Sequence, residues 1–502
     1  MVLDAFLRIV FQLFGVFANW SLPLLQKAVF KFWERKQPEV VSQRVCKILD
    51  YLGYSEDMVS LRRDHTRASP WFFNVASRRE TVIPAGSTAE GFVTHFESDH
   101  DTVLLQKNVV CVLFGKDLPQ YERDESVTVL KLEWKNCEPG YYRLILLKHG
   151  TESDPYIECS TVHCGNGKQY ISSDLYIQAH KIVSDRQETT PLTESHIAGP
   201  ALSGSSYLHN CDFVYAFKCD DHESLLSEWK QRNRLFEWPS EMLVHNVALF
   251  KAYLVPVGSK TSSTRDLEWR ICFMDGERKL IDSLNEFQYK IYIILKMVNT
   301  AELKCVCKEI TSYVMKNIFF WYLESNPLEV FTAERLLENT LNCLKNLRVA
   351  VDKSFLAKYM IPKRNLLAGR MEKEERKNLL SKLDTLIADG GGFIIRCPRI
   401  LFWLGEPEDA VERGLYYRLY IEKLYLQKLA IWNEYIDVDN LCQPERTEKE
   451  QESSEKEQMF VKDPRYQWIQ NKLYELLWPG WRKYKKGDRD KKLELKIKRM
   501  LS

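Results

Sequence analysis

The hydrophobic period of the chain changes near residue 274, and this change limits the folds open to it. Before that point, short runs rich in Val, Ile, Leu and Tyr alternate with turn signals such as Pro139-Gly140, as expected for β-strands. After it, apolar residues recur at helical spacing. The helical segments are 277–300, 305–325, 330–350 and 373–389. This order predicts an α+β protein in which a mixed sheet lobe packs against a C-terminal helical lobe.

The runs also predict where these lobes begin and end. A helix is expected at 40–53, ending near Gly53. The expected strands are TVIPAGS, DHDTVLL, VVCVLF, TVLKLEW, YYRLILL, CDFVYAFKC, KAYLVPVG and LEWRICF. We therefore predict a sheet lobe at 38–275, a helical lobe at 276–405 and a helical extension at 406–442.

Length, charge and cysteine content narrow the class of protein. A chain of 502 residues is too long for one core and predicts two or three domains. A net charge of +2 excludes a polycationic surface, so nucleic acid would have to meet local basic patches. Thirteen cysteines, an odd number without regular spacing, indicate reduced thiols in a cytosolic protein.

The N-terminal extension, residues 1–37, contains an apolar stretch at 5–25 that is followed by lysines and arginines. One interpretation is an amphipathic or packed terminal helix. The alternative is a signal anchor that leaves the remainder facing the cytosol and associates the chain with a membrane. A cleaved signal peptide is disfavoured, because no positive region precedes the apolar run.

The C-terminal region is expected to be helical and then polar. A helix is predicted at 413–436, and the almost wholly polar residues 443–458 predict a solvated linker. The basic helical tail at 459–502 is interpreted as a solvated helix face or as a contact for nucleic acid or acidic lipid.

A short segment after the first strand has the residue types that bind phosphates and metal ions. Gly86-Ser87 follows an apolar run, and glycine there lets backbone amides approach a triphosphate. Asp99 and Asp101 are two residues apart, so a strand would direct both carboxylates to one side. Two hard oxygen ligands on one face suit Mg²⁺. Asp212, in another strand-like run, is the candidate for the further carboxylate that a two-metal site requires.

These motifs resemble the cyclic GMP–AMP synthase-like (Mab-twenty-one domain) family, including its invertebrate members. The similarity is collinear over roughly residues 40–400. The blocks that bear it are AGSTAEGF…ESDHDTVLL, GYYRLILL, GPALSG, CDFVYAFKC, EWPS, YLVPVG, LEWRICF, ITSYVMKNIFFW and IPKRNLL. The resemblance implies a nucleotidyltransferase fold, in which a twisted mixed sheet bears the acids and a helical lobe closes a nucleotide cleft.

The resemblance also implies roles for individual residues. Gly86 and Ser87 would hold the triphosphate, and Asp99, Asp101 and Asp212 would hold two Mg²⁺ or Mn²⁺ ions as the catalytic and metal-binding residues.

Four further residues match nucleotide-binding positions of the family. Arg270 matches the arginine that reaches the nucleotides, and Lys296 matches a lysine near the donor phosphates. Ser312 and Tyr313 match a pair whose ring stacks on a base. The alternatives are an exposed helix lysine for Lys296 and a core aromatic for Tyr313.

Two features depart from the family pattern. The vertebrate DNA sensor carries a zinc-binding insertion soon after its WR block, whereas here LEWRICFMDGERK continues without His or Cys inserted. We therefore expect no zinc. Cys272 replaces a serine often found two residues after the arginine, which leaves the base preference open.

Two functions follow from the resemblance. The first is a Mg²⁺-dependent enzyme of innate immune sensing that makes a cyclic dinucleotide from ATP and GTP and is activated by a ligand such as double-stranded RNA. The second is a catalytically silent nucleotide-binding or scaffold protein of the same fold, anchored to a membrane if residues 5–25 span one.

Overall fold

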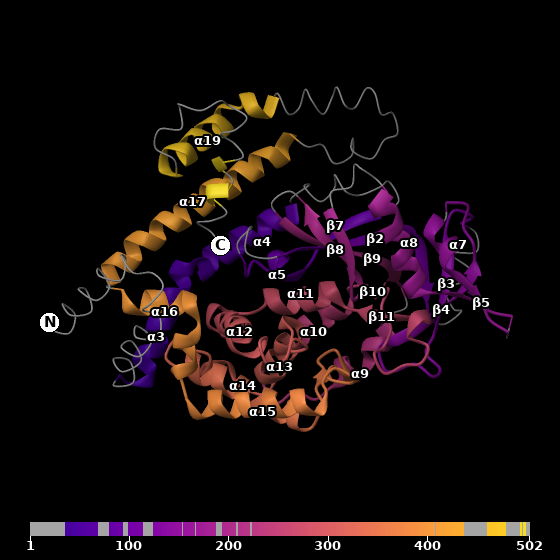
Figure 1. The fold of residues 1–502 in the computed structure, drawn as a ribbon, viewed down its shortest axis with the longest axis horizontal. Coiled ribbons are helices and arrows are strands. Elements are labelled where there is room, and N and C mark those ends of the chain that lie inside the picture. Colours follow the sequence, from indigo (N-terminus) through magenta and orange to yellow (C-terminus); the bar gives the residue numbers. More distant parts are fainter. Residues whose placement is uncertain are drawn as a thin grey trace. The chain divides into compact units, whose positions relative to one another are not determined.

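A computed structural model describes the fold of the chain (Figure 1). The described residues are 36–68, 80–93, 99–113, 124–152, 154–165, 167–186, 193–206, 209–220, 223–406, 408–435, 459–477, 492–493 and 495–497. The apolar stretch 5–25, the linker 443–458 and residues 478–491, 494 and 498–502 of the basic tail lie outside them. Within these ranges, no helix combines the length and the apolar character needed to cross a membrane.

The structure is α+β, as predicted, and its contacts divide it into two units. The described residues of the first, helical unit lie within Met1–Ser55, Glu223–Leu249 and Lys279–Tyr416. Those of the second unit, which contains the sheet, lie within Glu56–His222, Phe250–Arg278 and Tyr417–Ser502. Both units are discontinuous in the sequence.

An eleven-stranded sheet organises the second unit (Figure 1). Its main path is β1-β2-β3-β4-β11-β10-β9-β8-β7, and an additional β2–β9 pairing closes part of this path on itself. The two short strands β5 and β6 pair with each other, and β6 also pairs with β4. The strands are β1 Glu80–Pro84, β2 His100–Val112, β3 Thr128–Glu133, β4 Tyr141–Lys148, β5 Thr161–His163, β6 Gln169–Ile171, β7 Thr193–Ala198, β8 Ala201–Ser206, β9 His209–Cys219, β10 Ala252–Val255 and β11 Glu268–Cys272.

Strands β2 and β9 lie at the centre of this sheet and are buried on both faces. Val103 and Ala216 belong to an apolar cluster on one face, which also contains Val255. Leu104 and Phe213 belong to a cluster on the other face. A strand buried on both faces is almost continuously apolar, which explains why runs such as DTVLL and CDFVYAF predicted strands correctly.

Helices complete each unit. In the sheet unit they are α4 Glu56–Ala68, α5 Gly86–Ala89, α7 Pro155–Ser160, α8 Ser173–Arg186, α17 Glu408–Tyr435 from residue 417 onward, and α19 Pro464–Leu477. Helix α11, Met274–Asp282, spans the division between the units. In the helical unit they are α3 Pro38–Leu49, η1 Asp50–Tyr54, α9 Ser227–Gln231, α10 Glu241–Ala248, α12 Glu286–Val298, α13 Ser312–Glu324, α14 Leu336–Asp352, α15 Lys373–Ala388 and α16 Pro398–Gly405.

The predicted helix ends are confirmed at Gly53 and corrected at 277–300. Gly53 adopts φ 90°, a conformation open to glycine, where the first helical segment ends. The segment 277–300 is two helices rather than one, because Asn285 caps the start of α12. Its side chain accepts from the backbone N–H of Gln288, whose own side chain bonds back to the Asn285 backbone. This reciprocal pair is a capping box.

A buried histidine lies where α8 covers the sheet. The His180 ring stacks on the ring of Tyr215 of β9, with 3.5 Å between the ring centroids. The ring centroid of Tyr156 lies 3.9 Å from that of His180. Its Nε2 is buried and has no hydrogen-bond partner. Burial therefore lowers the pKa of His180 from 6.5 to about 3, because a charged imidazolium would lose its hydration there.

The unfolding free energy is expected to fall as the pH drops from about 6.5 toward 3. In that window the unfolded chain binds a proton at His180 that the folded chain excludes, which costs as much as roughly 5 kcal/mol. His180→Phe retains a ring beside Tyr215 but removes the proton site. Urea unfolding at a series of pH values should show a flatter acid slope for this variant than for the parent.

The exposed histidine His163 supplies the control. His163→Phe should leave the acid slope as it is in the parent. Equal slopes for the parent and His180→Phe would contradict the assignment of this proton to His180.

Candidate active site on the sheet

Two of the predicted acids are neighbours across a strand pair. Strands β2 and β9 run parallel, and their register pairs Asp101 directly with Asp212. Paired residues on adjacent strands direct their side chains to the same face. Both carboxylates are half-buried and lie on the face of Val103 and Ala216, since they are separated from these residues by even steps.

The Gly86-Ser87 turn packs directly against one of these carboxylates. Gly86 adopts φ 63°, and a Cβ placed there would overlap the Asp101 carboxylate. The backbone N–H of the preceding residue, Ala85, donates to the carbonyl of Asp101 at 2.9 Å. Only glycine therefore fits between β1 and this carboxylate, and the turn and the acid form one structure.

Asp99 lies beside the same turn but outside the strand. It precedes β2 by one residue and is exposed. Its carbonyl accepts from the Thr88 hydroxyl at 3.3 Å. Burial, and then the negative charges of Asp212 and Asp99, raise the pKa of Cys211 to about 12. The charges of both carboxylates therefore raise the pKa of the same thiol.

The donor set fits a hard divalent cation, although the side chains are not gathered into a complete site. Carboxylate oxygens are the ligands that Mg²⁺ prefers, and the missing Cβ of Gly86 leaves room for the Asp101 carboxylate. Across the described ranges, no three His, Cys, Asp or Glu side chains form a group that could hold one ion. The structure thus pairs Asp101 with Asp212 and leaves Asp99 at the edge.

Arg270 lies on the same face of the sheet as the acid pair. It pairs with Val255 of β10 and with Tyr141 of β4. Val255 belongs to the apolar cluster of Val103 and Ala216, whose face also bears Asp101 and Asp212. The neighbouring Trp269 lies on the opposite face, where it stacks on Phe217 at 4.8 Å.

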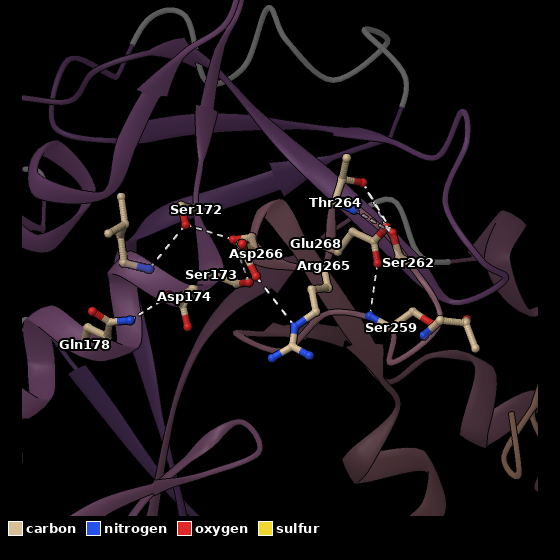
Figure 2. Close-up of polar contacts among 12 residues, drawn as sticks. Ser172, Ser173, Asp174, Gln178, Ser259, Ser262, Thr264, Arg265, Asp266 and Glu268 are labelled. Carbon is tan, nitrogen blue, oxygen red and sulfur yellow. Dashed lines mark hydrogen bonds and ion pairs between the residues drawn. The ribbon is translucent and has the colours of Figure 1, made fainter. Parts of the chain in front are cut away.

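A buried glutamate anchors the strand that bears Arg270 (Figure 2). Glu268 is fully buried and accepts from the backbone N–H of Ser259 at 3.0 Å and from the hydroxyls of Ser262 and Thr264. These bonds fold the β10–β11 loop over the start of β11. Glu268 was not among the residues predicted from the sequence, although the Ser- and Thr-rich stretch before it is a signal for such a loop.

The same strand is also held from the other side (Figure 2). The hydroxyls of Ser172 and Ser173 donate to the carbonyl of Asp266 at 2.8 and 3.2 Å. The indole N–H of Trp269 donates to the carbonyl of Ile171 at 2.8 Å. The residues that precede Arg270 in the sequence are therefore held by hydrogen bonds to two different segments, the β10–β11 loop and residues 171–173.

The remaining predicted residues belong to the helical unit. Lys296 is half-buried, with its Nζ 5.9 Å from the centre of the Tyr292 ring. The Tyr292 hydroxyl donates to the carbonyl of Ser312 at 3.5 Å, so Tyr292 links the two predicted residues. Ser312 is exposed at the start of α13, and Tyr313 beside it is half-buried.

Two comparisons with known proteins bear on the family of this chain. Residues 287–385 match the model of the Mab-21 protein HhH/H2TH-like domain. A stretch of 140 residues is 24% identical to a cyclic GMP-AMP synthase-like receptor of Aethina tumida, and covers 28% of this chain. The match spans about a third of that relative, 34% of its length.

The Mab-21 match implies a nucleotidyltransferase-like fold, with which the mixed sheet is consistent. Residues 287–385 thus match a Mab-21 domain, and part of the chain is similar to a cyclic GMP-AMP synthase-like receptor. This confirms the resemblance seen in its motifs.

Proposed function

We propose that the chain is a Mg²⁺-dependent nucleotidyltransferase that joins ATP and GTP into a cyclic dinucleotide. The observation that supports this most is the pairing of Asp101 with Asp212 beside the Gly86 turn. Two carboxylates and a close-approaching backbone are what a nucleoside triphosphate with its cation requires.

The acids and the Gly86-Ser87 turn have different proposed roles. Asp101 and Asp212, with Asp99 at the edge, would hold Mg²⁺ or Mn²⁺, which stabilises negative charge on the phosphates when bound. The backbone at Gly86 and Ser87 binds the triphosphate. A ribose hydroxyl of one nucleotide would attack the α-phosphate of the other, releasing pyrophosphate and a proton to solvent. A second transfer of the same kind, from the hydroxyl of the other ribose to the remaining α-phosphate, would close the ring and release a second pyrophosphate.

The other predicted residues complete nucleotide recognition. The guanidinium of Arg270 pairs with a phosphate or a base edge. In the helical unit, Lys296 binds the donor phosphates, and the ring of Tyr313 stacks on a base with Ser312 beside it.

The cell compartment and the activator belong to the same proposal. The cysteines in the described part of the chain are all free thiols, which fits the reducing cytosol. Double-stranded RNA, or another nucleic acid, is proposed as the activator, and its shape would be recognised through Lys and Arg contacts to phosphates and 2′-hydroxyls.

A second candidate is a scaffold that binds nucleotide without chemistry. It is favoured by the exposure of Asp99 and by the absence, in the described ranges, of a three-residue group that could hold a metal ion. A scaffold needs the turn and Arg270 but no complete metal site.

An assay of the full chain separates these two candidates. The protein is incubated with ATP, GTP and Mg²⁺, with duplex RNA, duplex DNA or neither, and the nucleotides are resolved by liquid chromatography and mass spectrometry. We expect a cyclic dinucleotide that disappears when EDTA removes the metal. Binding of nucleotide without any product would favour the scaffold, and neither binding nor product would contradict both candidates.

A further inference from the structure

Helix α4 presents three arginines to the backbone that follows the Gly86-Ser87 turn. Each guanidinium donates to a carbonyl at the end of the short helix α5. The pairs are Arg62 Nη1 with Gly91 O at 3.3 Å, Arg63 Nε with Glu90 O at 2.9 Å, and Arg67 Nε and Nη2 with Ala89 O at 3.2 and 3.0 Å. Charged donors make stronger hydrogen bonds than neutral ones, so α4 fixes the far end of the turn.

The close approach of α4 depends on a second glycine. Gly91 adopts φ 74°, and a Cβ there would overlap the backbone carbonyl of Val59 on α4 and press on the Arg63 side chain. The turn thus begins with a glycine against Asp101 and ends with a glycine against α4.

A glutamate of helix α17 binds the first of these arginines. Glu422 accepts from Arg62 Nε at 2.6 Å and from Nη2 at 2.8 Å. Both residues are buried, at 2% exposure for Arg62 and 1% for Glu422. A buried ion pair adds little net stability over an apolar pair, because both charges lose their hydration. Its two parallel bonds instead fix the guanidinium in the orientation that directs Nη1 to Gly91.

The position of Glu422 is itself set by the C-terminal hairpin, which we define as α17 from residue 417 with α19. The neighbouring Ile421 belongs to an apolar cluster shared by α17 and α19. The buried members of that cluster are Ile421, Leu424, Tyr425, Ile431, Phe460, Ile469, Leu473, Tyr474, Leu493 and Ile497.

We propose that Glu422, acting through Arg62, is a positioning residue for the Gly86-Ser87 turn, so that the C-terminal hairpin maintains the shape of the triphosphate-binding backbone. The nature of the ligand rests on the proposed function. The mechanical coupling does not, because it depends only on contacts within the sheet unit.

Hydrogen–deuterium exchange of the full chain tests the coupling without requiring catalysis. The amides of residues 89–92 donate to the carbonyls of residues 85–88 and report whether the turn is closed. Glu422→Gln keeps the size of the side chain but removes its charge. We expect these amides to exchange at least about tenfold faster in this variant, because the closed turn becomes less populated.

Glu434→Gln is the matched control. Glu434 also lies on α17 and pairs with an arginine, Arg465, but both are exposed. In the Glu434→Gln variant, the amides of residues 89–92 should exchange at the same rate as in the parent. Equal exchange in Glu422→Gln and Glu434→Gln, with both variants folded, would overturn the proposal.

If Glu422→Gln does not fold, Glu422→Asp carries the test, because it keeps the charge and retracts the carboxylate by one methylene. Unchanged exchange in this variant would likewise overturn the proposal.

Titration with ATP and Mg²⁺ then tests the ligand: the apparent affinity for ATP should weaken in step with the loss of the closed turn. If the parent is active, KM should rise more than kcat falls, since the turn binds ground state and transition state alike. Faster exchange in a chain that binds no nucleotide would retain the coupling and refute the proposed function.

Discussion

Replacement of both Asp101 and Asp212 by Asn is expected to lower cyclic dinucleotide formation by about a thousandfold or more. Asn keeps the size of each side chain but removes the negative charges that bind Mg²⁺, and metal stabilisation of phosphoryl transfer accounts for several kcal/mol of the barrier. Folding should survive, because adjacent carboxylates repel each other when no cation is present. Initial rates and thermal unfolding of the parent and the variant are to be measured together.

Asp174→Asn is the control for this variant, since Asp174 is exposed on α8, a helix whose Ile177 packs on the face of the sheet opposite to the acid pair. It should retain the parent rate. A double variant that unfolds, and whose activity falls only with the folded fraction, would show that the acid pair is structural.

Gly86→Ala is expected to destabilise the sheet unit by about 2 to 4 kcal/mol and to abolish nucleotide binding. Alanine is strained at φ 63°, and its Cβ would displace the Asp101 carboxylate. Gly199→Ala separates the two effects, because Gly199 has the same φ of 63° but open space at its Cβ position. It should lose only the strain energy, about 1 kcal/mol, and bind nucleotide as the parent does.

Urea unfolding and nucleotide titration of both glycine variants provide the measurement. Equal stability losses in the two variants would mean that the contact with Asp101 has no energetic consequence.

The acid pair could be predicted because its signals are local. Asp101 is followed by a run that must be a strand, and Asp212 lies within another. That β2 and β9 would pair in parallel, with these two residues opposite each other, is a long-range choice that no local pattern specifies. The family resemblance, rather than the residue pattern, implied that Asp101 and Asp212 belong to one site.

Contacts between distant segments could not be predicted in the same way. Glu422 is 360 positions from Arg62, and nothing in the helical pattern of α17 distinguishes it from an exposed glutamate. The break before α12 is different, since Asn285 and Gln288 are spaced as a capping box requires. That correction could have been made from the sequence.

Titration of Mn²⁺ with ATP present, followed by electron paramagnetic resonance, tests the proposed metal site most directly. Free Mn²⁺–ATP is subtracted using the nucleotide alone, so that only the protein-bound signal is compared. We predict that the parent gives a signal from bound Mn²⁺–ATP. Its affinity for Mn²⁺–ATP should fall at least about tenfold when Asp101 and Asp212 are both replaced by Asn. Equal Mn²⁺–ATP affinity in the parent and in a folded double variant would contradict the assignment of these two carboxylates as metal ligands.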